Sequence, residues 1–268
     1  MNTFKMLMLT GTLMLSTAAH AHRVWVETGH THGGEILKAE LGYGEFPDME
    51  PIAADRLNIF KPLQLVTAEG KQDLQQKGEH NYQYQSKRPV RDGSYLVIAE
   101  YLPTFWSKNA AGWKRVDMKA MPDATYCEQT RMYGKNIVNV GHESADTAII
   151  TKPVGHKLEI VPLDNPANIH VGERFKVKVL FNGEPLPNAT LTATFDGFDT
   201  SDRSKTHKVE AQAFSDKTGA DGTVDIIPLR QGFWKANVEH STAYSDPAVC
   251  QKQANYSTLT FEIGHAHH

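Results

Sequence analysis

Histidines gather near the two ends of this chain, and their spacing suits metal binding. The candidate ligands at the ends are His22, His30, His32, His265, His267 and His268. Imidazole nitrogens bind nickel, cobalt, copper and zinc when two or more rings come within a few ångströms of one another. His30 and His32 are two residues apart, so on an extended segment both rings point to the same side. The sequence therefore predicts a histidine metal site, with a solvated polar turn among neighbouring glycines as the alternative for this pair.

Residues 1–21 have the pattern of a secretory signal peptide. A lysine precedes the apolar run 6–15, and Ala19 and Ala21 stand at the positions that signal peptidase prefers. The apolar run is about half of the roughly twenty residues that a membrane-spanning helix needs. Cleavage after Ala21 would leave His22 with a free amine beside its imidazole, a pair that suits copper or nickel. Cleavage after Ala19 would place a histidine third from the amine. We expect an exported, periplasmic protein without a transmembrane segment after signal removal.

Composition excludes some classes of function and favours a disulfide. The chain has 268 residues, a formal net charge of −3 and 40% hydrophobic residues, so it offers no basic field for nucleic acid. Its two cysteines, Cys127 and Cys250, are far apart, and in an oxidising compartment we expect them to form one long-range disulfide. The alternative is a thiolate metal ligand. The sequence has no nucleophile elbow, phosphate loop, zinc-protease helix or dinucleotide fingerprint, so we do not expect an enzyme.

Short runs rich in β-branched and aromatic residues recur along the whole chain, each bounded by turn-forming residues. The predicted strands are 23–27, 35–41, 95–101, 175–180, 191–195, 223–227, 233–238 and 257–263. This spacing is typical of β-sandwiches. We predict an all-β fold with two β-sandwich domains, of which the second is immunoglobulin-like. The predicted divisions are a signal peptide at 1–21, an N-terminal β domain at 22–155, the second sandwich at 156–264, and a histidine tail at 265–268.

Two polar connections, 70–78 and 109–127, interrupt the strands of the first half. Connections of this length are uncommon within a compact domain unless they contain structure or serve a function. We expect short helices or functional loops there.

A series of short motifs resembles a family of exported proteins of unknown function. The motifs are Ala21–Trp25, Gly42–Glu45, Tyr101–Lys108, Tyr133–Lys135, Thr218–Gly222, Gly232–Trp234, His240 and Leu259–Phe261. Members of this family are described as periplasmic components of cobalt and nickel uptake. The resemblance implies a two-domain β protein that binds nickel or cobalt first, with copper or zinc possible. It also implies an inner-membrane permease or an outer-membrane receptor as the partner.

Within the resemblance, His22 and His240 carry over as metal ligands. The pair His30 and His32 and the terminal histidines are features of this sequence rather than of the family pattern.

Two other functions remain open from the sequence. An amino-terminal histidine with one further imidazole can form a copper brace, which predicts a copper-binding protein or oxidase. A metal-independent module that binds a partner or glycan is the third hypothesis. In that hypothesis the tryptophans Trp25, Trp106, Trp113 and Trp234 are core or contact aromatics.

Overall fold

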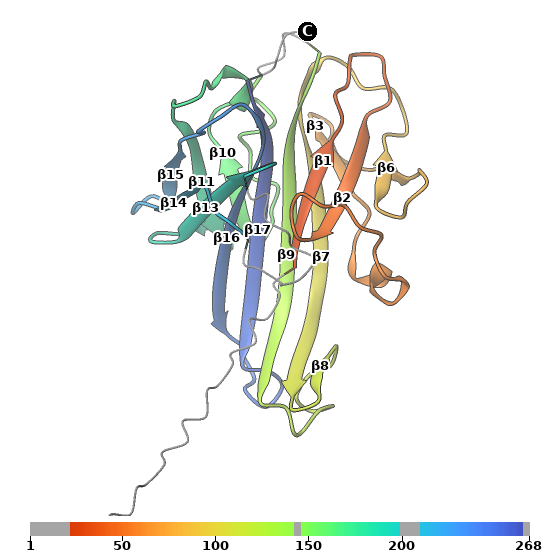
Figure 1. The fold of residues 1–268 in the computed structure, drawn as a ribbon, viewed down its shortest axis with the longest axis vertical. Coiled ribbons are helices and arrows are strands. Elements are labelled where there is room, and N and C mark those ends of the chain that lie inside the picture. The colour runs from red at the N-terminus through yellow and green to blue at the C-terminus, as the bar shows by residue number, and fades with distance from the viewer. Residues whose placement is uncertain (1–21, 142–145, 199–209, 265–268) are drawn as a thin grey trace, which may run out of the picture.

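The computed structural model describes residues 22–141, 146–198 and 210–264, and these residues form an all-β protein (Figure 1). The strands are β1 (Arg23–Thr28), β2 (Lys38–Gly44), β3 (Gln64–Thr67), β4 (Gly70–Asp73), β5 (Gln75–Gln76), β6 (Gln83–Gln85), β7 (Gly93–Asn109), β8 (Gly112–Lys114), β9 (Tyr126–Val140), β10 (Leu158–Pro162), β11 (Phe175–Phe181), β12 (Glu184–Pro185), β13 (Thr190–Phe195), β14 (Phe214–Lys217), β15 (Thr223–Ile226), β16 (Gly232–Ala243) and β17 (Lys252–Ile263). Two short 3-10 helices, η1 (Ala54–Ile59) and η2 (Pro166–Asn168), complete the described elements. No helix in these ranges is long and apolar enough to cross a membrane.

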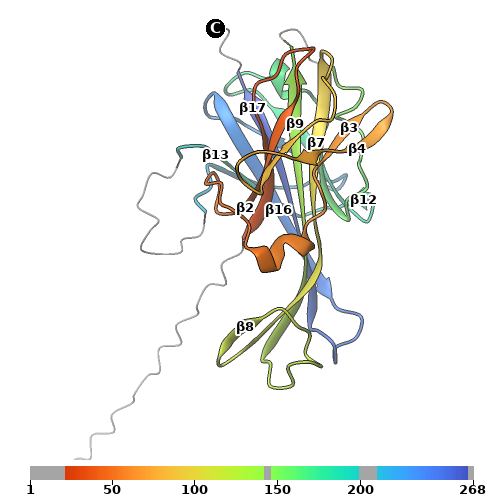
Figure 2. The same ribbon diagram turned by 90° about the vertical axis from the view of Figure 1, so that its right-hand side faces the viewer.

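A nine-stranded sheet forms the middle layer of the molecule. Its order is β14-β13-β16-β17-β9-β7-β3-β4, with β8 paired to β7. Strands β17 and β9 pair in parallel, and this pairing joins the two halves of the chain in one sheet. The sheet β1-β2-β6-β5 covers one face, and β10, β11, β12 and β15 cover the other (Figure 1). The long ends of β7, β9, β16 and β17 project beyond these covering layers (Figure 2).

Each face of the middle sheet has its own hydrophobic core, because side chains alternate between the faces along a strand. On the β1 side, Val24 and Leu41 pack against Val97 and Val138. The core on the opposite face includes Ile137, Val177, Leu191, Trp234, Leu259 and Phe261. The prediction of two β-sandwiches is therefore confirmed. The C-terminal sandwich consists of two packed antiparallel sheets, as in immunoglobulin-like folds.

The position expected for the domain boundary, 155/156, lies in the connection between β9 and β10. The two halves of the chain nevertheless share the middle sheet, so each half uses the other's strands to bury its apolar face.

The long polar connections contain strands rather than helices. Residues 70–78 include β4 and β5, and 109–127 includes β8 and the start of β9. The expectation of short helices there was wrong, because backbone pairing with β3, β6 and β7 stabilises these segments despite their polar side chains. The predicted strand at 35–41 also starts late, at Lys38.

Candidate metal site

His30 and His32 lie together in the loop that follows β1. Their ring centres are 4.6 Å apart, and the ring planes are nearly perpendicular, at 86°. His30 is exposed and His32 is partly buried, so a solute can reach the pair. A metal about 2.0–2.1 Å from an imidazole nitrogen is about 3.2 Å from the ring centre. Two rings bound at neighbouring coordination positions would then have centres about 4.5–5 Å apart. The observed separation suits that arrangement.

The backbone on both sides of the pair is held by hydrogen bonds. The Thr31 carbonyl accepts a bond of 3.1 Å from the Gly141 N–H at the end of β9, and Thr31 is buried. The His32 N–H donates to the Glu35 carboxylate at 2.9 Å, and the Gly33 N–H donates to Asp92 at 3.0 Å. The loop is therefore fixed to neighbouring strands, which lowers the conformational entropy lost when a ligand binds.

His22 lies at the other end of β1 from this pair. Its ring packs edge-on against Tyr43, with centres 5.1 Å apart. Tyr43 in turn stacks on Tyr101, and the centres of these two rings are 6.0 Å apart. Burial raises the pKa of Tyr101 to about 12, so this neighbour remains a neutral phenol. Six residues of β1 separate His22 from the loop, a distance of about 20 Å. The structure does not bring His22 to His30 and His32.

His240 lies in a third place, on β16. Its ring contacts Phe181, with centres 4.5 Å apart, on the face of the middle sheet covered by β11. The preceding residue, Glu239, is on the opposite face and pairs with Arg23 at 3.1 Å. The sheet therefore separates His240 from His22, the other residue that the family resemblance assigned to the metal.

Within the described ranges, no three histidine, cysteine, aspartate or glutamate side chains form a group that could hold a metal ion. Of the predicted ligands in these ranges, only His30 and His32 are brought together. The terminal ligands His265, His267 and His268 lie outside the described residues.

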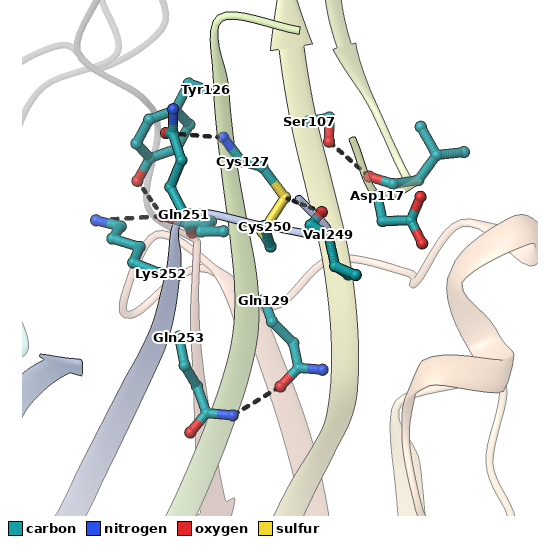
Figure 3. The surroundings of a disulfide bond; sticks show 12 residues. Ser107, Asp117, Tyr126, Cys127, Gln129, Val249, Cys250, Gln251, Lys252 and Gln253 are labelled. Carbon is teal, nitrogen blue, oxygen red and sulfur yellow. Dashed lines mark hydrogen bonds and ion pairs between the residues drawn. A yellow bond between two sulfur atoms is a disulfide. The ribbon is translucent and has the colours of Figure 1, made fainter. Parts of the chain in front are cut away.

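Cys127 and Cys250 form the predicted disulfide (Figure 3). It joins the start of β9 to the residue two before β17, at the ends of the two strands that pair in parallel. Both cysteines are fully buried. They are therefore a structural crosslink between the two halves of the chain, and the thiolate-ligand alternative is wrong.

A buried cluster of ionisable side chains was not foreseen from the sequence. The Lys135 ammonium on β9 donates to the Glu159 carboxylate on β10 at 2.6 Å, and both side chains are only 2% exposed. His156 stacks on Tyr133 with ring centres 4.8 Å apart. Burial, followed by the charges of Lys135 and Lys71, holds the pKa of His156 well below its ordinary value. This cluster joins the middle sheet to the β10 layer, and its members come from sequence positions that no local pattern connects.

Several residues of the family motifs have a packing role. Trp25 is fully buried and lies opposite Gly42 in the register of β1 and β2. A Cβ at position 42 would be 2.0 Å from the indole ring, so only glycine fits there. A Cβ at Gly134 would likewise be 3.3 Å from the Trp25 backbone. The glycines of these motifs thus allow β1 to pack closely against β2 and β9. This packing role does not indicate a ligand.

Comparison with known proteins identifies a family but not an activity. No curated protein sequence matches the chain. Among solved structures, the D0–D1 domain of intimin aligns with 89% of this chain and 96% of its own, at 12% identity and a TM-score of 0.21. The D00–D0 domain of intimin aligns with 90% of this chain and 100% of its own, at 9% identity and a TM-score of 0.22. A family model described as a domain of unknown function (DUF4198) matches residues 19–242, and the chain belongs to that family.

Proposed function

We propose that this protein captures a divalent transition metal in the periplasm, nickel or cobalt first, and passes it to a transporter. The observation that carries the proposal is the contact between the His30 and His32 rings, whose centres are 4.6 Å apart. The family resemblance supplies nickel or cobalt as the cargo, and the signal-like residues 1–21 support export. An inner-membrane permease or an outer-membrane receptor is the proposed partner.

A site with two imidazoles suits a carrier better than a permanent cofactor. Two protein donors leave the other coordination positions of nickel or cobalt to water or to a donor from the partner. Such an ion is held moderately and can be released by ligand exchange. The hydrogen bonds of the His32 and Gly33 N–H groups hold the loop backbone before the metal arrives, which lowers the entropy lost on binding.

Metal titration of the mature protein tests this proposal. Because the terminal histidines are a second candidate site, the titration is made in a background in which His265, His267 and His268 are all alanine. Nickel and cobalt should then bind with a stoichiometry of one, measured by calorimetry and native mass spectrometry. In the same background, changing both His30 and His32 to alanine should abolish that binding.

His170 provides the matched control, because it is also an exposed histidine beside a carboxylate. Its ring lies 3.1 Å from Glu173, and its side chain is 81% exposed. His170→Ala should leave nickel binding unchanged. Equal nickel affinity for the protein with and without His30 and His32 would refute the proposed site. Loss of binding only when the tail histidines are removed would move the capture role to the tail.

The copper-brace alternative receives less support from the structure. It needs a second imidazole beside His22, and neither the loop pair nor His240 lies near that residue. The competition arm of the native mass spectrometry, with copper and zinc offered together with nickel and cobalt, tests it directly. Copper that is retained without His30 and His32, and lost when His22 is changed to alanine, would favour the brace.

A further inference from the structure

On the β10 side of the middle sheet, two cations lie close together without a carboxylate partner. Arg131 belongs to β9, and Lys157 directly precedes β10. Among the described residues neither side chain forms an ion pair with aspartate or glutamate. Burial and then the charge of Arg131 lower the pKa of Lys157, which places the two cations within electrostatic reach of each other. Both side chains are partly exposed, and two neighbouring like charges without a carboxylate attract an anion.

Two glutamines connect these cations, and the direction of their hydrogen bonds is fixed by the lysine. The Lys157 ammonium donates to Gln253 Oε1, because an ammonium has only donors. Gln253 Nε2 must then be the donor to Gln129 Oε1, at 2.7 Å (Figure 3). Arg131 Nη2 approaches the same oxygen at 3.5 Å. Both amide oxygens thus accept hydrogen bonds within the network, and N–H groups of Gln129 and Arg131 remain as donors for a ligand.

One of those donors is already buried without a partner. Arg131 Nε has no hydrogen bond, and the charge of this guanidinium partly offsets the burial that raises the pKa of the neighbouring Tyr133 hydroxyl. Asn255, opposite Arg131 in the register of β17 and β9, is fully buried and its Oδ1 is also unpartnered. Buried polar groups are nearly always hydrogen-bonded, so an unpaired donor and acceptor at one register position indicate a missing partner.

We propose that Arg131 and Lys157 form a binding site for a small oxyanion, a molecule with a carboxylate or phosphate group. The guanidinium supplies forked donors that match either group, and Lys157 adds a second positive charge. The Gln129 amide faces the same network, and a hydroxyl on the ligand or a bound water would satisfy Asn255 Oδ1.

Aromatic packing closes one side of this oxyanion site. The His240 ring packs on Phe181, and Lys157 Nζ lies 5.6 Å from the centre of the same phenyl ring. The site is separate from the His30–His32 pair, because Arg131 and the end of β9 are nine residues, or about 30 Å, apart. The oxyanion site therefore does not depend on the proposed metal function.

Titration of the metal-free full-length mature protein with inorganic phosphate and with citrate, at constant ionic strength, tests the oxyanion site. At least one anion should bind in calorimetry and shift the NMR resonance of the Arg131 Nε–H. The tighter anion identifies the group that the site prefers. Arg131→Gln should weaken binding about tenfold to a hundredfold, since it removes charge-assisted hydrogen bonds.

Arg174→Gln is the matched control, because it removes the same charge from a side chain that is 77% exposed and already paired with Asp225. It should leave anion binding unchanged. Lys157→Gln is the second variant, at a surface-accessible position, and should also weaken binding if Arg131→Gln fails to fold. The absence of binding by both anions, or equal affinities in wild type and Lys157→Gln, would overturn the proposal.

Discussion

Replacing Glu159 by glutamine should be among the most destabilising single changes in this protein. Its carboxylate accepts a hydrogen bond of 2.6 Å from the Lys135 ammonium. It also accepts hydrogen bonds of 2.6 and 3.1 Å from the backbone N–H groups of Val154 and Gly155. Both charged side chains are 2% exposed, so Glu159→Gln leaves a buried ammonium without its counter-charge. Breaking one partner of a buried ion pair costs about 3–5 kcal/mol, and we expect a loss of unfolding free energy in this range.

The Lys61–Glu100 pair is a control with the same chemistry and a different environment. Its N–O distance is also 2.6 Å, but its side chains are 47% and 33% exposed. Glu100→Gln should therefore cost less than about 1 kcal/mol. Urea unfolding of both variants and the wild type, followed by circular dichroism at neutral pH, gives the two differences. Equal losses for Glu159→Gln and Glu100→Gln would refute the conclusion that burial makes the inner pair the more important one.

Three further predictions concern the cores and the crosslink. The folded-state pKa of His156 lies well below 6.5, so the unfolded chain takes up a proton first and stability should fall as pH falls below that value. His156→Phe should flatten this part of the pH profile of urea unfolding. Gly42→Ala should lower the free energy of unfolding by about 1–3 kcal/mol or more, because its Cβ would lie 2.0 Å from the Trp25 ring. Gly29→Ala is the control in thermal unfolding and should be tolerated, because its Cβ would have no atom within 4 Å. Replacing both disulfide cysteines by serine should lower the free energy of unfolding by up to about 5 kcal/mol. The crosslink spans 123 residues and so restricts the entropy of the unfolded chain. A melting temperature insensitive to that change would contradict a stabilising crosslink.

The predicted strands at 175–180 and 257–263 were confirmed as parts of β11 and β17, but the central strand β9 was not predicted from the sequence. β11 alternates apolar and charged residues from Phe175 to Val179, a period of two that is typical of a strand with one polar face. β9 has no such pattern, because it is the centre of the molecule and carries buried polar residues on both faces. Lys135 on one face and Asn136 on the other are each 1% exposed and are satisfied by partners distant in sequence.

Only part of the candidate site could be predicted from local sequence spacing. The adjacency of His30 and His32 follows from their spacing of two, which the sequence displays directly. The separation of His22 from His240 depends on which face of a shared sheet each residue occupies, and this follows from the pairing of β16 with β17 and of β17 with β9. Gln253 and Gln129, which the pairing of β17 with β9 brings together, connect Lys157 to Arg131, so no sequence motif marks the oxyanion site.

X-ray absorption spectroscopy of the nickel-loaded protein tests the metal proposal most directly, in the background that lacks the tail histidines. The proposal predicts a first coordination shell with two imidazole nitrogens, completed by water oxygens. Both imidazole contributions should disappear when His30 and His32 are changed to alanine. A nickel shell that retains its imidazoles in that variant, or that contains none in the parent protein, would contradict the account.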